Sequence, residues 1–370
     1  MALGAGNKVR VLIVDDSALV RKILSEALSK DPQIEIVGTA PDPVVAQERI
    51  AKLKPDVLTL DLEMPRMDGL TFLRKLMAES PMPVVIISSL VKASQENAIE
   101  ALRSGAVEVL AKPNGPYSVG DLVDHLCFKI RAAAHARVQR KPLPSGMASR
   151  PLALSKPAAP VIPGDDPALH YPEHSLFAIG ASTGGTEAIL NVMSRLPRNS
   201  PGILVTQHIP AGFSKTFAER LHENCAMEVK EAVDGDMVGP GKALVAPGGY
   251  HMLLRWAGTG YRVVVKEGPL VCYQRPSVDV MFQSVVGVAR GPVVAVLLTG
   301  MGSDGAQGMV ALRKAGAQTI AQDEQSCVVF GMPKEAIRLG GAVQTLPLLK
   351  IPSAMVAALR NAPVLAGRAW

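Results

Sequence analysis

The sequence predicts two α/β domains, each built on a doubly wound parallel sheet. Three observations predict this fold class. The chain has 370 residues, more than one hydrophobic core usually organises. In both halves, apolar runs of strand length alternate with amphipathic stretches, which is the rhythm of βα units. The composition is typical of proteins that bury parallel sheets, with 48% apolar residues, 19% charged residues and 33 glycines.

The first half contains five predicted strands, each followed by a helical or loop segment. They are Val9–Val14, Ile34–Ala40, Val57–Leu60, Val84–Ser88 and Val107–Leu110. The segment after the first strand has apolar residues at helical spacing, which predicts one buried face packed on the sheet. The residues of that face are Leu19, Val20, Ile23, Leu24, Ala27 and Leu28.

The composition changes sharply between the two halves. Eight prolines lie from Pro142 to Pro172, which predicts an extended linker. Residues 131–164 contain six Arg or Lys and no Asp or Glu, so this segment accounts for the whole net charge of +6. Neither folded half therefore has the basic surface expected of a nucleic-acid-binding domain. We predict a first domain over 8–130, a linker over 131–172 and a second domain over 173–365.

The α/β rhythm resumes in the second half after Ser175. Predicted buried strands are Leu176–Ile179, Gly202–Thr206, Lys242–Ala246 and Val293–Thr299. The alternation over Arg262–Lys266 is less regular, and we expect an edge hairpin there.

No segment of the sequence indicates a membrane or secreted protein. No apolar run approaches the roughly 20 residues that a membrane-spanning helix needs, and Met1–Arg10 lacks the apolar core of a secretory signal. The four cysteines have no CxxC spacing, so we expect ordinary buried thiols in a reducing compartment. They are Cys127, Cys225, Cys272 and Cys327. These features predict a cytoplasmic protein without membrane insertion.

Acidic residues follow two predicted strands of the first domain. Asp15 and Asp16 end the first strand, Asp61 ends the third, Ser88 ends the fourth, and Lys112 (followed by Pro113) comes after the fifth. Since the carboxyl ends of parallel strands face a common crevice, these side chains should meet there. Three carboxylates in one place predict a site for Mg²⁺.

This arrangement predicts phosphoryl transfer onto a carboxylate. Asp61 would be the nucleophile, Lys112 and Mg²⁺ would neutralise charge on the transferring oxygens, and Ser88 would sense the product by a hydrogen bond. The alternative is that Asp15 and Asp16 only cap the helix that follows them. That alternative leaves Asp61 and Lys112 unexplained.

The second domain begins with a strand, a glycine-rich turn and a helix expected to start near Thr186. Gly180, Ser182 and Gly184 fit the G-x-S-x-G pattern, in which a sharp turn presents a serine hydroxyl beside helix N-terminal amides. The alternative is a phosphate or nucleotide site, but the sequence has neither G-x-G-x-x-G nor a Walker lysine here.

Two further strand ends provide partners for Ser182. His208 follows the next strand in TQHIP, and Asp304 follows Val293–Thr299 in TGMGSDG. Ser182 would attack an acyl carbonyl, His208 would take its proton, and Asp304 would orient the imidazole. Taken singly, Ser182 and Asp304 are also explained as helix N-caps and His208 as a core histidine. We interpret His222 and His251 as structural.

The motifs VLIVDDS, DVLTLDLEMPRMDG, VVIISS and AKP resemble the receiver domain of two-component response regulators over nearly all of residues 9–130. The resemblance implies that Asp61 is the phospho-acceptor and that Asp15 and Asp16 bind the metal, with the carbonyl of Glu63 completing the site. Val109 stands where many receivers have an aromatic switch residue, so the tyrosine form of that switch is not expected.

The motifs IGASTGG, QHIP, APGGYH and LLTGMGSDGAQG resemble the catalytic domain of the CheB family of chemotaxis receptor methylesterases. The resemblance implies hydrolysis of glutamate methyl esters on chemoreceptors, and deamidation of receptor glutamines. Ser182, His208 and Asp304 fall on the family's catalytic triad. Thr183 and Met301 match positions near it, and Met301 is expected to give a backbone amide to the oxyanion hole.

Together the two resemblances imply a flavodoxin-like receiver and a Rossmann-like three-layer methylesterase domain. The receiver would cover the esterase crevice until Asp61 is phosphorylated. Mg²⁺ would serve the receiver, and the esterase chemistry would need no cofactor. The expected partners are methylated chemoreceptors and the pathway's histidine kinase. Two alternatives stay open, a nucleic-acid-binding output domain and a noncatalytic scaffold regulated by phosphorylation.

Overall fold

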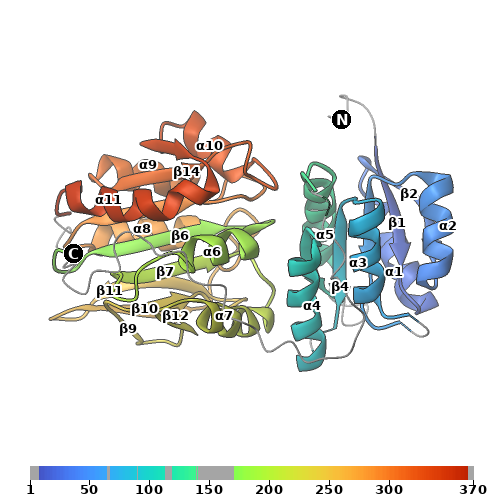
Figure 1. Ribbon diagram of the computed structural model, residues 1–370, viewed down its shortest axis with the longest axis horizontal. Helices are drawn as coiled ribbons and strands as arrows, with labels where there is room; N and C mark the ends of the chain where they lie inside the picture. Colours follow the sequence, from blue (N-terminus) through green and yellow to red (C-terminus); the bar gives the residue numbers. More distant parts are fainter. Residues whose placement is uncertain are drawn as a thin grey trace. The chain divides into compact units, whose positions relative to one another are not determined.

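The computed structural model describes residues 8–64, 67–89, 91–112, 119–138, 140 and 171–365. These residues form two compact units, one within 1–147 and the other within 148–370 (Figure 1). Most of the predicted linker and Pro113 lie outside the described residues. The predicted domain boundaries at 130 and 173 stay predictions.

The first unit is a five-stranded parallel sheet in the order β2-β1-β3-β4-β5. Its strands are β1 (Val9–Val14), β2 (Ile34–Ala40), β3 (Val57–Leu60), β4 (Val84–Ser88) and β5 (Glu108–Ala111). Its helices are α1 (Ala18–Leu28), α2 (Pro43–Leu53), α3 (Gly69–Glu79), α4 (Lys92–Ser104) and α5 (Val119–Ala134). Four strands have the predicted bounds, and the fifth begins and ends one residue later than predicted.

The predicted buried face of α1 is only partly correct. Leu24, Ala27 and Leu28 are buried, whereas Leu19 is 66% exposed. Helical spacing fixes the angular position of a residue around the axis, but not which turns of the helix lie over the sheet. Leu19 is in the first turn, which begins at the N-cap Ser17, and the apolar contacts of α1 come from its later turns.

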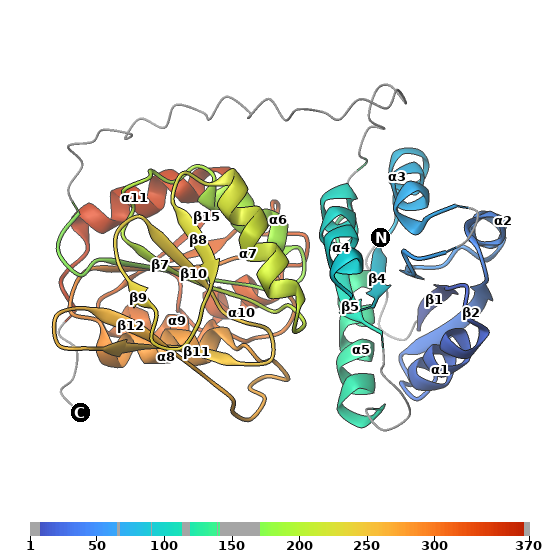
Figure 2. The same cartoon turned by 90° about the horizontal axis from the view of Figure 1, so that it is seen from below.

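The second unit has a seven-stranded parallel sheet in the order β15-β14-β13-β6-β7-β10-β8. Its strands are β6 (Leu176–Ala181), β7 (Gly202–Gln207), β8 (Glu228–Glu231), β10 (Lys242–Val245), β13 (Val293–Leu297), β14 (Gln318–Gln322) and β15 (Gln344–Leu346). The helices are α6 (Gly185–Met193), α7 (Phe213–Asn224), α8 (Val278–Val288), α9 (Ala306–Lys314), α10 (Met332–Arg338) and α11 (Ile351–Asn361), with a short 3₁₀ helix η2 (Leu348–Lys350). Each of the two units is thus a doubly wound α/β fold, as predicted, and Figure 2 shows their helices on both faces of the sheets.

A second, antiparallel sheet was not predicted. It contains β11 (His251–Trp256), β12 (Tyr261–Lys266) and β9 (Met237–Val238) in the order β11-β12-β9. The expected hairpin at 262–266 is present, because β12 pairs with β11. The expected hairpin is not at the edge of the parallel sheet: β12 also pairs with β9 and is the central strand of a separate sheet. Tyr261 and Val263 are buried and lie on the same face of β12, since side chains two residues apart in a strand point the same way.

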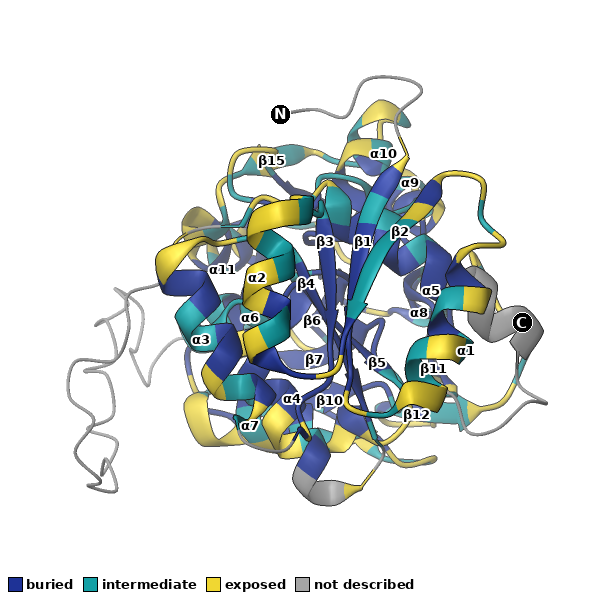
Figure 3. Cartoon of the chain, turned by 90° about the vertical axis from the view of Figure 1, so that its right-hand side faces the viewer, coloured by how far each residue is buried: buried dark blue, intermediate teal, exposed yellow. Residues whose placement is uncertain are grey.

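The central strands of both parallel sheets are buried, as the dark blue of β1, β3, β4, β6 and β7 in Figure 3 shows, whereas the edge strands β2, β8 and β15 are partly exposed. Each sheet has a topological switch point, where successive connections run in opposite directions along the sheet. This point lies between β1 and β3 in the first unit and between β13 and β6 in the second. Ligand crevices in open parallel sheets lie at such points, outside the carboxyl ends of the strands. Within the described residues, no helix has the length and apolar character to span a membrane.

Candidate functional site

The acidic residues of the first unit lie together at its switch point. Asp15 and Asp16 follow β1, Asp61 follows β3, and one carboxylate oxygen of each lies within 4.8 Å of the others. Asp15 and Asp61 are buried, and Asp16 is exposed. The predicted clustering of these three carboxylates is therefore present.

Lys112 lies against this cluster. Its Nζ is 2.8 Å from Asp61 Oδ2 and 3.2 Å from Asp15 Oδ2. Burial raises the pKa of Asp61 above its ordinary value, and the bond to Lys112 only partly offsets this effect. Burial alone would lower the pKa of Lys112, but the hydrogen bond to Asp61 and the charges of Asp61 and Asp15 together raise it. The lysine is therefore a fixed positive charge beside the carboxylates.

The donor set fits a hard divalent cation. It consists of carboxylate oxygens, the ligands that Mg²⁺ prefers. Asp15 Oδ2 is buried and accepts no well-directed hydrogen bond from the described residues, although Lys112 is near. A buried carboxylate oxygen without a hydrogen bond is unfavourable unless a cation or water compensates it.

The side chains of Ser88 and Glu63, the two other residues predicted for this site, form hydrogen bonds with Ser94 of α4. The Ser88 hydroxyl lies 3.3 Å from the Ser94 carbonyl, to which it donates, so it is engaged with α4 rather than with Asp61. The Glu63 amide donates to Asp61 Oδ1 over 3.2 Å, and the Glu63 side chain accepts from the Ser94 hydroxyl. The backbone of Glu63 is thus beside Asp61, while its carboxylate is not part of the cluster.

In the second unit, Ser182 sits on the predicted sharp turn between β6 and α6. The turn is closed by a hydrogen bond from the Gly185 amide to the Ser182 carbonyl, 2.7 Å long. The N-cap of α6 is Gly184, with φ of +76°, so Ser182 is not the cap. A Cβ at Gly300 would lie 2.7 Å from Ser182 Cβ, which explains the need for glycine where the loop after β13 approaches the serine.

Sheet register places His208 beside Ser182. Ala181 of β6 pairs with Gln207 of β7, and the His208 amide donates to the Ala181 carbonyl over 3.1 Å. Ser182 and His208 are the next residues on adjacent strands, whose backbones lie about 4.8 Å apart. Both side chains are buried, with 1% and 4% exposure of the residues.

His208 is held by Asp304, and its bond to that carboxylate makes it more than a core histidine. His208 Nε2 lies 2.7 Å from Asp304 Oδ2, whereas His208 Nδ1 is buried and has no hydrogen-bond partner among the described residues. With Nε2 occupied by the carboxylate, Nδ1 is the nitrogen left for proton transfer. The structure therefore joins two of the three predicted residues directly and puts the third on the adjacent strand.

The Asp304 carboxylate lies at the N-terminus of α8, not at that of α9. It accepts hydrogen bonds from the Ser277 hydroxyl (2.7 Å) and from the amides of Val278 (2.7 Å) and Asp279 (3.0 Å). Burial acts to raise the pKa of Asp304, but the bond and charge of His208 and the bonds from Ser277 and Asp279 outweigh it and lower the pKa. Asp304 is thus kept ionised.

Sequence reasoning missed three neighbours of the triad. Gln207 donates through Nε2 to the carbonyls of Ser182 (2.8 Å) and His208 (3.3 Å). Ser277 binds Asp304, and His251 Nδ1 accepts from the Ser277 amide over 3.3 Å. His251 remains structural but lies in the chain of hydrogen bonds to the site. Gln207 could have been noticed in the sequence, because it directly precedes His208 in the QHIP motif. No local sequence pattern indicated Ser277.

The expectation of four buried thiols is wrong for Cys272, which is exposed, and Cys225 is only half-buried. Cys272 lies with Asp279 and Asp304 in a group whose ligand atoms are within 4.8 Å of one another. Burial of the sulfur and the charges of both carboxylates raise the pKa of this thiol. Since Asp304 already accepts four hydrogen bonds and Cys272 favours its neutral form, this group is not a good metal site.

Thr183 and Met301, the two residues predicted near the triad, lie directly after Ser182 and in the loop after β13. Thr183 is buried, and its carbonyl accepts from the Thr299 hydroxyl over 3.0 Å. Met301 is half-buried in the loop after β13. Across the described part of the chain, its amide donates to no backbone acceptor. The role of both residues in the oxyanion hole stays a prediction.

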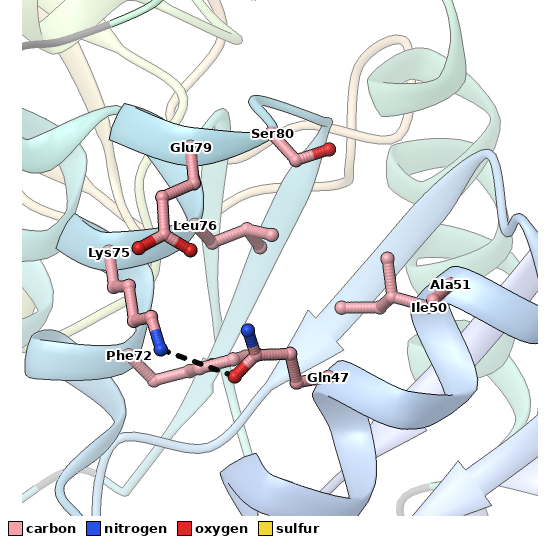
Figure 4. A pocket seen from close by; sticks show the side chains of 8 residues that line it. All are labelled: Gln47, Ile50, Ala51, Phe72, Lys75, Leu76, Glu79 and Ser80. Carbon is pink, nitrogen blue, oxygen red and sulfur yellow. Dashed lines mark hydrogen bonds between the residues drawn. The ribbon is translucent and has the colours of Figure 1, made fainter.

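A shallow pocket lies between α2 and α3 of the first unit, away from both sites (Figure 4). Lys75 Nζ and Gln47 Oε1 are 3.4 Å apart across it. Phe72 and Leu76 contribute apolar surface. None of the predicted site residues lines this pocket.

Comparison with known proteins identifies a family for each of the two units. The CheB methylesterase family model matches residues 177–355, and the response regulator receiver domain model matches residues 11–124. A protein of Syntrophus aciditrophicus named protein-glutamate methylesterase/protein-glutamine glutaminase 2 is 51% identical over 350 residues, which is 95% of this chain and 99% of that protein.

A second relative, from Anaeromyxobacter dehalogenans and named protein-glutamate methylesterase/protein-glutamine glutaminase 5, is 52% identical over 349 residues, covering 93% of this chain and 95% of its own length. The crystal structure of the Thermotoga maritima CheB methylesterase catalytic domain matches 49% of this chain and 97% of its own, with 38% identity and a TM-score of 0.48. The matched output family is a methylesterase, so neither a nucleic-acid-binding output nor a scaffold gains support. The chain belongs to the CheB family of methylesterases and carries their N-terminal response regulator receiver domain.

Proposed function

We propose that this chain is a phosphorylation-activated protein-glutamate methylesterase that hydrolyses glutamate methyl esters on chemoreceptors and deamidates receptor glutamines. The observation that carries the proposal is the 2.7 Å contact of His208 Nε2 with Asp304 Oδ2, made beside Ser182 at the switch point of the sheet. Its substrates are methylated chemoreceptors, its phosphodonor is the histidine kinase of the pathway, and it acts in the cytoplasm.

The chemistry follows from the two nitrogens of His208. Because Nε2 donates to Asp304, Nδ1 is the base that takes the Ser182 proton as the serine oxygen attacks the ester carbonyl. The same nitrogen then returns the proton to the leaving methoxide, and methanol departs. Water hydrolyses the acyl-enzyme by the same route and leaves a free glutamate. With a glutamine substrate the leaving group is ammonia.

The developing oxyanion requires hydrogen-bond donors near Ser182. The backbone amide of Met301 is the donor that we assign, with Thr183 beside it at the start of the turn into α6. Donors fixed in place before the reaction stabilise the transition state without reorganising.

Phosphorylation takes place on Asp61 in the first unit. Asp15, Asp16 and Asp61, with the Glu63 carbonyl, are the residues that would hold Mg²⁺, which supplies positive charge to the transferring phosphoryl oxygens. Lys112 contributes a second positive charge from 2.8 Å. The Ser88 hydroxyl has to leave the Ser94 carbonyl before it can bind the new phosphoryl group. Breaking this contact couples phosphorylation to the start of α4.

The regulation rests on two states of the first unit. Phosphorylation replaces the single negative charge of the Asp61 carboxylate by a phosphoryl group that carries nearly two, and this change can shift an equilibrium between two interface states. We assign the receiver to 8–130, the linker to 131–172 and the methylesterase domain to 173–365. In the unphosphorylated state the receiver restricts access to Ser182, and phosphorylation releases it.

The test measures methanol released from membranes bearing methylated receptors, with and without a small phosphodonor. The wild-type chain should be activated by the phosphodonor. Asp61→Asn should keep the basal rate and lose activation, because it removes the acceptor carboxylate. Ser182→Ala should release no methanol while Asp61 is still phosphorylated. Activation of the Asp61→Asn variant would refute the regulation, and methanol release by Ser182→Ala would refute the assigned nucleophile.

A further inference from the structure

Asp304 binds the N-terminus of α8, the helix that contains Asp279, and Asp279 binds the N-terminus of α9, the helix that follows Asp304. Asp304 precedes α9, but its carboxylate accepts from the α8 amides of Val278 and Asp279. Asp279 lies in the first turn of α8, and its Oδ1 accepts from the Gly308 amide of α9 over 2.6 Å. The Gly305 amide binds the same carboxylate. The two helix N-termini are thereby linked in both directions.

This exchange places a second carboxylate beside Asp304. Burial, together with the nearby charge of Asp304, raises the pKa of Asp279 to about 6, against the opposing effect of the hydrogen bonds from the amides of Gly308 and Gly305. A half-buried carboxylate next to another one is costly, and an apolar residue at this place would avoid the cost. What compensates this cost is the hydrogen bonding of the Asp279 carboxylate to the N-terminus of α9.

Close packing transmits the position of α8 to the catalytic residues. Val278, the first residue of α8, would clash with any Cβ at Gly180 (2.3 Å) or Gly305 (2.7 Å). Gly180 lies in β6, two residues before Ser182, and Gly305 directly follows Asp304. A Cβ at Gly308 would similarly lie 2.5 Å from Phe282 Cβ of α8. The N-terminus of α8 therefore has no room to move toward Gly180 or Gly305. Because the α8 amides bind the Asp304 carboxylate, the position of this N-terminus determines where the carboxylate is held.

We propose that Asp279 is a positioning residue for ester hydrolysis: by binding the N-terminus of α9 it fixes the loop that carries Asp304, and so orients His208. This inference rests on the proposed function. Asp279 itself touches neither His208 nor Ser182 by any hydrogen bond in the described structure. It acts only through the carboxylate of Asp304 and the amides that both helices present.

The test compares Asp279→Ala and Asp279→Asn in the full-length chain by methanol release. Asp279→Ala should lower kcat by about 10- to 100-fold, with KM within about 2-fold, because a small displacement of a catalytic group affects the transition state more than binding. Asp279→Asn should recover most of this loss, since its amide oxygen still accepts from Gly308. The low-field proton resonance of the His208–Asp304 hydrogen bond should shift or broaden in Asp279→Ala and stay near its wild-type position in Asp279→Asn.

Asp236→Ala is the matched control. Asp236 also accepts from a backbone amide, that of Val233 (2.8 Å), in the same unit and outside the site. This variant should keep the wild-type kcat and resonance. If Asp279→Ala fails to fold, Asp279→Leu, which is apolar and closer in size, replaces it in both measurements. Wild-type kcat and an unshifted resonance in the variant without the carboxylate would overturn the inference and leave the proposed function intact. A wild-type chain that releases no methanol would refute the proposed function itself.

Discussion

Replacing Asp304 by Asn should lower the kcat of ester hydrolysis by about 10⁴-fold, as loss of the orienting carboxylate does in other serine hydrolases. The four groups around this carboxylate are all donors in the assigned state: His208 Nε2, the Ser277 hydroxyl and two α8 amides. An asparagine amide group has only one acceptor oxygen, so its NH₂ must face one of these donors. The substitution therefore favours the wrong imidazole tautomer and disturbs the helix N-terminus.

The measurement is single-turnover methanol release by Asp304→Asn and wild type. Asp61 phosphorylation by a small phosphodonor is the internal control, since the acidic cluster lies in the other unit, and it should proceed at the wild-type rate. A kcat within about 10-fold of wild type, with the fold intact, would show that Asp304 does not orient the base.

Replacing Lys129 by Met should destabilise the first unit by about 3–5 kcal/mol, the usual cost of leaving one member of a buried ion pair uncompensated. Lys129 of α5 is 2% exposed and Glu108 of β5 is 4% exposed. Their Nζ and Oε2 atoms are 2.8 Å apart. Without the lysine, Glu108 must either ionise without this charge partner or take up a proton. The prediction is checked by urea unfolding of the full-length chain, followed through the transition of the first unit.

Lys22→Met provides the matched comparison. Lys22 and Glu26 are 3.8 Å apart, and both side chains are more than half exposed. Such a surface pair contributes little, so this variant should change the free energy of unfolding by less than about 0.5 kcal/mol. The double variant Glu108→Leu, Lys129→Met should recover much of the loss. A cost for Lys129→Met no larger than that for Lys22→Met would mean that the buried pair does not stabilise the unit.

The parts of the fold that follow a short local pattern could be predicted from the sequence. The strands Val9–Val14 and Val57–Leu60 are short and predominantly apolar, with one polar residue each, so both their existence and their bounds could be predicted. The clustering of Asp15 with Asp61, and of His208 with Asp304, followed from one rule. Residues just after parallel strands meet at one edge, and the two switch points brought them together.

Features that depend on contacts between distant segments could not be predicted. The exposure of Leu19 depends on which turns of α1 lie over the sheet. The central position of β12 depends on its pairing with β9, over 20 residues earlier. Asp279 looks like an ordinary first-turn acid in sequence. Its bond to Gly308 exists only because α8 and α9 pack closely. Cys272 was misjudged because a free cysteine is usually buried, whereas this one lies on an exposed turn.

The most direct measurement is the mapping of a covalent adduct. The full-length chain is treated with a serine-directed alkyl fluorophosphonate, and the modified residue is located by mass spectrometry alongside methanol release. We expect one adduct, on Ser182, that forms as esterase activity is lost, and far slower labelling in a His208→Ala variant. An adduct elsewhere, or an unlabelled Ser182 in an enzyme that still releases methanol, would contradict the assignment of Ser182, His208 and Asp304 as one catalytic unit.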